Sequence, residues 1–266
     1  MSPGSSRPLV FGHRGASAHL PEHTLEAYQL ALAQGVEGVE CDVRMTRDGH
    51  LVCLHDARLD RTSNGTGRVS RHSLAELNEL DFASWHPGAR TAAGLTVRDD
   101  AGRVLTLDRL VTVLKHAGRP VRLLIETKHP TRYGAAVERE LVALLRRHGL
   151  PNPAPDAPVH VSAMSFSPLA LRRLRSLEPA LPTVLLLDLL PRGVPVGKLP
   201  FGARIAGPSI ELVRARPDLV ERFHSRGYGV YVWTVNEPSD VDLVCELSVD
   251  GIITDRPADV LAHVSR

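Results

Sequence analysis

Short apolar runs rich in valine, isoleucine and leucine alternate along the chain with segments whose apolar residues recur at helical spacing. This alternation is typical of β-α-β units around a parallel sheet. Strands are predicted at Leu9–His13, Val36–Asp42, Val121–Thr127, Val159–Met164, Thr183–Leu187, Ala203–Ala206, Val230–Val235 and Gly251–Thr254. Helices are predicted at Thr24–Gln34, Leu107–Ala117, Gly134–His148, Pro168–Leu177, Arg216–Arg226 and Ser239–Leu247. Because eight parallel strands close a barrel, the pattern predicts an α/β protein with the TIM (β/α)8 barrel fold.

A further apolar run, Leu51–Leu54, follows the second predicted strand too closely for a helical crossover, which needs about a dozen residues. It must therefore return antiparallel, and Asp48-Gly49 suits a two-residue hairpin turn because both positions tolerate positive φ. Such a turn places Asp42 directly opposite His55. We therefore expect Glu40, Asp42 and His55 to share one face of the hairpin.

The segment at about 57–106 is predicted to be irregular, with one short helix near Ser73–Leu80. Its length, about fifty residues, is unusual for a plain connection and indicates an insertion over the barrel mouth that serves as a lid or faces the substrate. The whole chain of 266 residues is long enough for one large core and short for two ordinary domains. We therefore predict a single domain over residues 1–266 that carries this insertion.

Charge and hydropathy narrow the classes of partner. Lys and Arg number 32 against 30 Asp and Glu, a net charge of +2, and no basic block with interleaved aromatic residues occurs. Nucleic acid is therefore not an expected partner. No apolar run approaches the roughly twenty residues of a membrane helix, and the first residues lack the pattern of a signal peptide.

The cysteines bear on the redox compartment. Cys41, Cys53 and Cys245 are odd in number and lack a C-x-x-C spacing, which argues against a disulfide framework and against a zinc site. The predicted hairpin register also places Cys41 and Cys53 on opposite faces. We therefore expect a soluble protein in the reducing cytoplasm. The sequence leaves its oligomeric state open.

Ionisable residues gather where predicted strands end. The candidates are His13, Arg14, Glu40, Asp42, His55, Glu126 and Lys128. In a TIM barrel the C-terminal strand ends converge on one mouth, so these side chains are expected to meet there. Together they offer what phosphodiester hydrolysis needs: charge neutralisation, a base for the nucleophile and an acid for the leaving oxygen.

Three carboxylates, Glu40, Asp42 and Glu126, would repel one another in a confined cleft unless a cation neutralised them. Oxygen ligands without cysteine or paired histidine favour one divalent cation, magnesium or calcium, with manganese possible, over zinc. The alternative is that these acids form ordinary ion pairs at strand ends.

The remaining candidates have roles suited to a phosphate ester. His13 and His55 are the best acid–base pair because imidazole titrates near neutral pH, although either could be a structural histidine. Arg14 and Lys128 could hold a phosphate, or could be solvated charges at the rim. Trp233 could form an apolar wall for glycerol carbons, and packing in the barrel core is the alternative.

The order of several short motifs resembles the glycerophosphodiester phosphodiesterase family. The motifs are His13-Arg14-Gly15, Pro21-Glu22-His23-Thr24, Glu40-Cys41-Asp42-Val43, Thr46-Arg47-Asp48-Gly49, His55-Asp56, Glu126-Thr127-Lys128, Trp233-Thr234-Val235-Asn236 and Thr254-Asp255-Arg256-Pro257. They run from Phe11 to Pro257, nearly the whole chain. Each motif is weak alone, but their order and spacing together are highly specific.

The resemblance implies the same fold and the same site: a cation held by Glu40, Asp42 and Glu126, acid–base work by His13 and His55, phosphate contacts from Arg14 and Lys128, and a substrate pocket lined by Trp233. It also implies the reaction, hydrolysis of glycerophosphodiesters, such as glycerophosphocholine or glycerophosphoethanolamine, to glycerol 3-phosphate and an alcohol. It leaves open the headgroup, the metal, the division of roles between the histidines, and whether the first step gives a cyclic phosphate or uses water directly.

One position departs from the family pattern, because His23 stands where the family usually has asparagine. Thr24 still fits as the N-cap of the next helix, so the fold is expected to survive. The substitution either alters substrate preference or metal affinity, or is a neutral change in a loop.

Two other functions are compatible with the same residues. A lysophospholipase D or a sphingomyelinase D-like enzyme would act on lipid-sized phosphodiesters and needs an apolar approach, for which the insertion offers Phe82, Trp85 and Leu95. A catalytically inactive phosphodiester-binding protein would keep the pocket without turnover.

Overall fold

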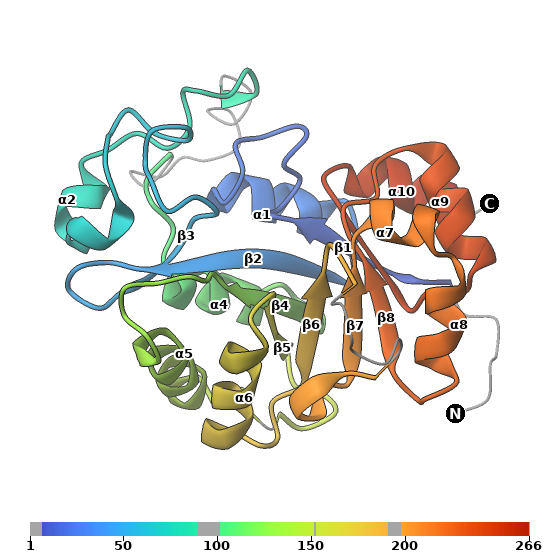
Figure 1. The fold of residues 1–266 in the computed structure, drawn as a ribbon. Helices are drawn as coiled ribbons and strands as arrows, with labels where there is room; N and C mark the ends of the chain where they lie inside the picture. The colour runs from blue at the N-terminus through green and yellow to red at the C-terminus, as the bar shows by residue number, and fades with distance from the viewer. Residues whose placement is uncertain (1–6, 90–101, 152, 191–197, 266) are drawn as a thin grey trace.

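In the computed structural model, residues 7–89, 102–151, 153–190 and 198–265 are described. Eight parallel strands form a closed barrel, because β1 pairs with β9 on one side and with β2 on the other (Figure 1). These strands are β1 (Leu9–His13), β2 (Gly38–Met45), β4 (Val121–Thr127), β5 (Val159–Ser165), β6 (Thr183–Leu187), β7 (Ile205–Pro208), β8 (Gly229–Val232) and β9 (Gly251–Thr254). The predicted TIM barrel is thus confirmed.

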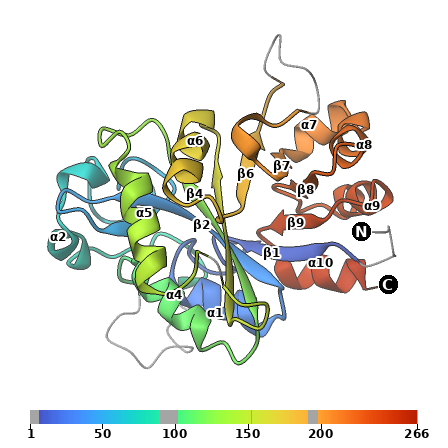
Figure 2. The ribbon, with the colours of Figure 1, turned by 90° about the horizontal axis from the view of Figure 1, so that it is seen from below.

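Helices follow the strands and surround the barrel (Figure 2). They are α1 (Leu25–Ala33), α4 (Leu107–Lys115), α5 (Ala136–Arg147), α6 (Pro168–Leu177), α7 (Ile210–Ala215), α8 (Asp218–His224), α9 (Pro238–Glu246) and α10 (Pro257–Val264). The predicted Thr24 cap is present, since its side chain accepts a hydrogen bond from the Ala27 amide. Two helices, α7 and α10, were not predicted because their apolar stripes are only two turns long.

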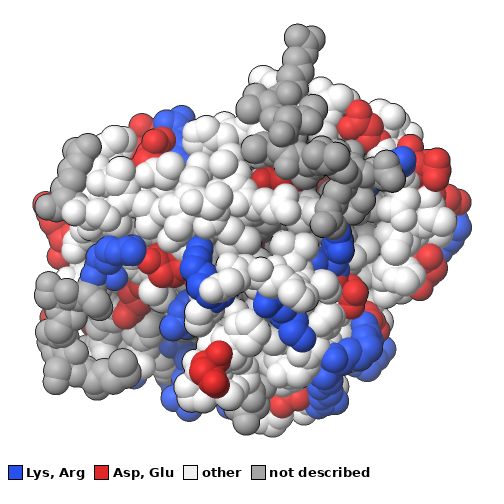
Figure 3. Space-filling model, turned by 180° about the vertical axis from the view of Figure 1, so that it is seen from behind, with Lys and Arg blue, Asp and Glu red and all other residues white. Residues whose placement is uncertain are grey.

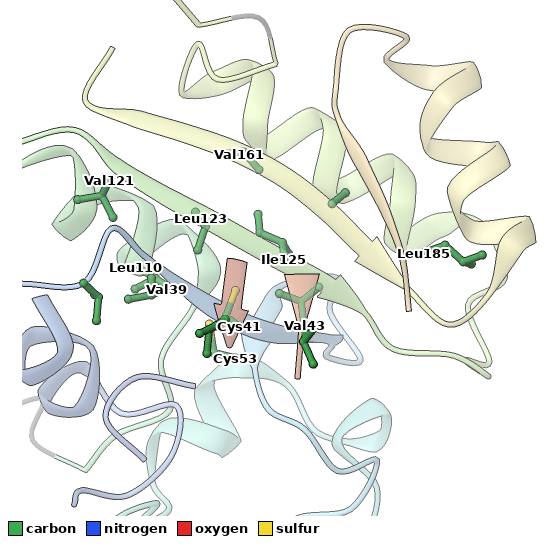
Figure 4. Packing of buried hydrophobic residues seen from close by; sticks show 14 of the residues in the cluster. Val39, Cys41, Val43, Cys53, Leu110, Val121, Leu123, Ile125, Val161 and Leu185 are labelled. Atoms are coloured by element: carbon green, nitrogen blue, oxygen red, sulfur yellow. The ribbon is translucent and has the colours of Figure 1, made fainter. Parts of the chain in front are cut away.

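The core lies in two layers because successive side chains of a strand point to opposite faces. Leu123 and Ile125 of β4 face outward and pack with Val39 of β2 and Leu110 of α4 (Figure 4). Leu124 faces inward, into a smaller cluster that fills the barrel. This double burial explains why the strands are nearly continuous apolar runs.

The β2–β3 hairpin has a different register from the predicted one. The strand β3 (Leu51–Cys53) is antiparallel to β2 as expected, but Met45 pairs with Leu51, a shift of one residue. The turn has three residues instead of two: the Thr46 amide donates to the His50 carbonyl, and Gly49 takes the positive φ. Asp42 therefore lies opposite Leu54 and not His55.

This shift reverses the expectation for the two cysteines. Cys53 is opposite Val43 and points to the same face as Cys41, so both thiols are buried in the outer core layer (Figure 4). A slip of one residue moves every side chain of a strand to the other face, which is why the prediction failed. All three cysteines are free.

The segment after β3 carries the 3-10 helix η1 (Val69–Arg71) and the short helix α2 (Leu74–Asn78), shorter than the predicted Ser73–Leu80. Ser73 and Glu76 form a capping box at the start of α2. The segment has its own small core, which includes Leu59, Leu77 and Phe82. A second 3-10 helix, η2 (Pro200–Gly202), precedes β7.

Within the described residues, every helix is too short or too polar to cross a lipid bilayer.

Candidate active site

A cavity of about 200 Å³ opens at the C-terminal ends of the barrel strands. The polar side is formed by His13, Arg14, Glu40, His55, Glu126 and Lys128. The opposite side is an apolar wall that includes Met164, Phe166 and Trp233. The structure therefore brings together residues from β1, β2 and β4, the end of the hairpin, and the residue after β8, as the strand-end argument predicted.

Strand pairing places the acids next to one another. Asp42 of β2 is directly beside Glu126 of β4, and Glu40 of β2 is beside His13 of β1. The three carboxyl groups of Glu40, Asp42 and Glu126 are buried, and each offers an oxygen within 4.8 Å of the others. Three converging oxygens of this kind fit a hard divalent cation, so the donor set is suited to magnesium or calcium.

The protonation states show how crowded this cluster is. Burial and the Asp42 charge raise the pKa of Glu40 well above its usual range, and the same causes raise the pKa of Glu126 to about 8. Burial also disfavours the Asp42 carboxylate, but a hydrogen bond from His23 and the charges of Lys128 and Arg14 hold its pKa well below normal. A bound cation would favour the charged forms of Glu40 and Glu126 and displace protons from them.

Two basic residues reach into the same cluster. The Lys128 ammonium lies 3.0 Å from Asp42 Oδ1 and 2.9 Å from Glu126 Oε1. Arg14 Nε lies 3.0 Å from Asp42 Oδ2 without the angle of a hydrogen bond, so this buried donor has no acceptor among the described residues. The guanidinium and the ammonium both line the cavity. Both can therefore serve an anion that enters it.

Each imidazole is anchored through one nitrogen. His13 Nδ1 is 2.7 Å from Asp255 Oδ1, and His55 Nδ1 is 2.7 Å from Asp56 Oδ1. His13 Nε2 lies 4.0 Å from Glu40 Oε2, on the carboxylate side of the cavity. Burial lowers the pKa of His55, although Asp42 opposes that shift. A carboxylate on Nδ1 fixes the tautomer and leaves Nε2 available for proton transfer.

The partner of His13 was not singled out from the sequence. Asp255 follows β9, and its carboxylate also accepts hydrogen bonds from Ser17 Oγ at 2.9 Å and Asn236 Nδ2 at 2.7 Å. Asn236 Oδ1 in turn accepts from Thr254 Oγ1 and from the Asp255 amide. A Thr-Asp pair at the end of the last strand was the available signal, because strand ends of a TIM barrel form its site.

The acid beside His55 belongs to a second network that the sequence did not reveal. Arg61 donates from Nε to Asp56 Oδ2 at 2.6 Å, and both of its terminal nitrogens donate to the Glu22 carboxylate at 2.8 Å. Glu22 also accepts from Arg14 at 3.0 Å. His55 and Arg14 are thus connected through Arg61, a residue of the predicted insertion.

His23 lies against the carboxylate cluster. Its Nε2 is 3.0 Å from Asp42 Oδ2, and its Nδ1 is 2.8 Å from the Tyr28 hydroxyl. The ring is fully buried, and burial lowers the pKa of His23. Nε2 can donate to Asp42 and so orient that carboxylate, while the Tyr28 hydroxyl beside Nδ1 also donates to the Glu40 carbonyl at 3.2 Å. His23 therefore contacts a predicted metal ligand, and its effect on substrate preference or metal affinity stays a prediction.

The apolar wall has a defined geometry. Trp233 donates from Nε1 to the Gly207 carbonyl at 2.7 Å, and its ring meets Phe166 edge-on with centroids 5.4 Å apart. Of the insertion residues that could form a lipid approach, Phe82 is buried, Trp85 is 37% exposed, and Leu95 lies outside the described residues. Phe82 therefore packs in the small core and is unavailable to a substrate.

Comparison with known proteins gives consistent matches. Residues 13–259 match the glycerophosphoryl diester phosphodiesterase family. A Mycobacterium tuberculosis protein named probable glycerophosphodiester phosphodiesterase 1 is 47% identical, over 95% of this chain and 91% of its own length. A putative glycerophosphoryl diester phosphodiesterase from Silicibacter pomeroyi has a crystal structure with a TM-score of 0.81 and 29% identity, covering 98% of this chain and 94% of that one. An Oleispira antarctica phosphodiesterase, solved with the product sn-glycerol-3-phosphate, has a TM-score of 0.81 and 24% identity, covering 98% of each chain.

Proposed function

We propose that this chain, which belongs to the glycerophosphoryl diester phosphodiesterase family and is a glycerophosphodiester phosphodiesterase, hydrolyses its substrate with one divalent cation and two histidines. The substrates are glycerophosphodiesters such as glycerophosphocholine or glycerophosphoethanolamine, and the products are sn-glycerol 3-phosphate and the free alcohol. The product bound to the Oleispira antarctica protein supports this substrate class. The observation that carries the proposal is one cavity lined by two carboxylate-anchored imidazoles and by Glu40 and Glu126, whose carboxylates converge with that of the buried Asp42.

Glu40, Asp42 and Glu126 hold the cation, magnesium or calcium, with manganese as a substitute. When bound, it supplies a Lewis acid that neutralises charge on the phosphoryl group. Arg14 and Lys128 contact the remaining phosphoryl oxygens, and the Arg14 Nε donor that lacks an acceptor supports this role. Trp233 and Phe166 cover the apolar face of the substrate.

The histidines move the protons. One Nε2 takes the proton of the attacking oxygen as that oxygen bonds to phosphorus, and the other gives a proton to the alcohol oxygen as its bond to phosphorus breaks. The attacking oxygen belongs either to the neighbouring glycerol hydroxyl, which yields a cyclic phosphate that water opens, or to water. Asp255 and Asp56 stabilise whichever imidazolium forms, since each accepts from Nδ1.

We also propose one domain over residues 1–266 with the insertion at about 57–106 beside the mouth, supported by the contacts of Arg61 with Asp56 and Glu22. A cytoplasmic setting is part of the proposal and is supported by three free cysteines.

A second candidate function is hydrolysis of lipid-sized phosphodiesters. Phe166 lines the cavity and is 39% exposed, and Leu169, just after it in the chain, is 54% exposed. An acyl chain could rest on such side chains. Turnover of lysophosphatidylcholine at a rate similar to that of glycerophosphocholine would favour this second function, and turnover of glycerophosphocholine alone would exclude it.

The test measures release of glycerol 3-phosphate from glycerophosphocholine. EDTA should abolish release, and a single added cation should restore it, which a purely binding protein could not show. His13→Ala and His55→Ala should each lower kcat by about 100-fold or more, the range for lost acid–base catalysis. His263→Ala is the matched control, because that histidine pairs with Asp242 on the surface. Near-normal turnover in either cavity variant would contradict the assignment.

A further inference from the structure

A second cavity, of about 270 Å³, lies directly beside the catalytic one. It is bounded by β2, by η1 and by the loop after β4, and we name it the arginine cavity. Its charged lining residues are Arg44, Arg68, Arg71, Lys128 and Arg132. The other residues that line it are apolar, hydroxyl-bearing or aromatic, and none is Asp or Glu. On the face seen in Figure 3, by contrast, acidic and basic side chains are both scattered over the surface.

Lys128 pairs with Asp42 and Glu126 of the carboxylate cluster, but three other basic side chains of this cavity have no carboxylate partner among the described residues. Within the described ranges, no carboxylate pairs with Arg68, Arg71 or Arg132, whereas Arg47 and Arg58 nearby are both paired. Arg132 instead stacks over the Tyr133 ring at 5.7 Å. Arg44 donates from Nε to the His55 carbonyl at 2.8 Å. In the described part of the chain, Arg68, Arg71 and Arg132 thus share one concave site without a paired acid, and cations in such an arrangement favour an anion.

The walls of the arginine cavity are held together. The Tyr133 hydroxyl donates to the Ser70 carbonyl at 2.9 Å, which ties the loop after β4 to η1. The Val69 amide donates to the Ala57 carbonyl, which ties η1 to the chain just after His55. The cavity is therefore organised before a ligand arrives, which lowers the entropic cost of binding.

The arginine cavity is continuous with the catalytic machinery. Lys128 lines both cavities. Ala57, two residues after His55, lines the arginine cavity, and Arg44 contacts the His55 backbone. The wall shared at Lys128 is where the alcohol portion of a bound phosphodiester would reach this cavity.

We propose that the arginine cavity binds a phosphomonoester carried on the leaving alcohol of the substrate. The inference rests on the proposed function and adds the substrate class: glycerophosphodiesters whose alcohol is itself phosphorylated. Guanidinium groups suit this anion because they donate in a fork to its oxygens. A cationic alcohol such as choline gains nothing from the same residues.

The test compares two substrates that differ only in this group, glycerophosphoinositol and glycerophosphoinositol 4-phosphate. Wild-type kcat/KM should be about tenfold or more higher for the phosphorylated substrate, as expected for one or two charge-assisted contacts. The double variant Arg68→Gln, Arg132→Gln should lose this preference through KM while kcat for glycerophosphocholine stays unchanged. Arg226→Gln, which removes an exposed arginine shortly after α8 that lines neither cavity, is the matched control.

A binding measurement separates this inference from the proposed function. Calorimetric titration with inositol 4-phosphate should show binding that weakens about tenfold or more in the double variant, whether or not any diester is hydrolysed. Equal kcat/KM for the two substrates, or equal binding by wild type and double variant, overturns the inference even if glycerophosphocholine is a good substrate. Inorganic phosphate that binds as tightly as inositol 4-phosphate, without a substrate preference, would identify a free-anion site and also overturn it.

Discussion

Replacing Asp255 by asparagine tests how His13 is held for catalysis. The aspartate uses both oxygens: Oδ1 accepts from His13 Nδ1 at 2.7 Å and from Ser17, and Oδ2 accepts from Asn236 Nδ2 at 2.7 Å. Asparagine keeps the shape but replaces one acceptor by an NH2 donor. Asn236 cannot turn to suit it, because its own oxygen already accepts from Thr254 and from the backbone.

Either orientation of the new amide loses a contact. If the NH2 group of the new asparagine faces Asn236, two NH2 donors face each other. If it faces His13, it donates to Nδ1, which forces the ring proton onto Nε2. A hydrogen bond to a charged group contributes about 1.5–3 kcal/mol. At 1.36 kcal/mol per tenfold, loss of this contact in the transition state lowers kcat by about 10- to 150-fold. KM should change little, because Asp255 does not line the cavity.

The assay is steady-state release of glycerol 3-phosphate from glycerophosphocholine, with the melting temperature measured for each variant. Asp242→Asn is the control, because Asp242 also pairs with a histidine, His263 at 2.6 Å, but on the surface. Ser17→Ala removes one donor to the same carboxylate and should cost less than about threefold, since the His13 contact remains. A folded Asp255→Asn enzyme with kcat within twofold of wild type would refute the reasoning.

Two further predictions concern stability. Burial acts to raise the pKa of Glu22, but the hydrogen bond from Arg61 and the charge of Arg14 outweigh it and lower the pKa from 4.5 to about 2. The ionised Glu22 side chain therefore stabilises the folded state above pH 4.5. This contribution to stability is lost as the pH falls toward 2. The unfolding free energies of wild type and Glu22→Gln should therefore converge over this window, and a constant difference would contradict the shift. Leu123→Ala should cost about 2–5 kcal/mol in urea unfolding without changing kcat, because Leu123 is fully buried and faces the helices. Leu169→Ala, at a side chain that is 54% exposed, should stay within about 0.5 kcal/mol.

The residues that the sequence could reveal are those placed by strand position. His13 and Glu126 lie at or next to the ends of their strands, and Glu40 is in register with His13, so closing the barrel brings them to one mouth regardless of details elsewhere. His55 reached the same cavity although the hairpin register was shifted by one residue. Its arrival depends on the chain returning beside β2, and not on which residue lies opposite Asp42.

The hydrogen-bond partners that hold the cavity residues in place could not be predicted from strand position. Asp255 is 242 positions from His13, and Arg61 is 39 positions from Glu22. No periodicity or spacing relates such residues, because their contacts exist only when distant strands and loops have packed. The same holds for the arginine cavity, whose walls come from β2, η1 and the loop after β4.

The alternation of apolar runs and helical stripes by itself determined the barrel, since parallel strands buried on both faces have few other ways to satisfy their hydrophobic surface. Together with the ionisable residues at strand ends, it also determined which side chains gather at the mouth. Only the tertiary structure decided the hairpin register, the Asp255–His13 and Arg61–Glu22 contacts, and the position of His23 against Asp42. These depend on turn geometry and on packing between segments far apart in the chain, where a shift of one residue costs little locally but changes which groups meet.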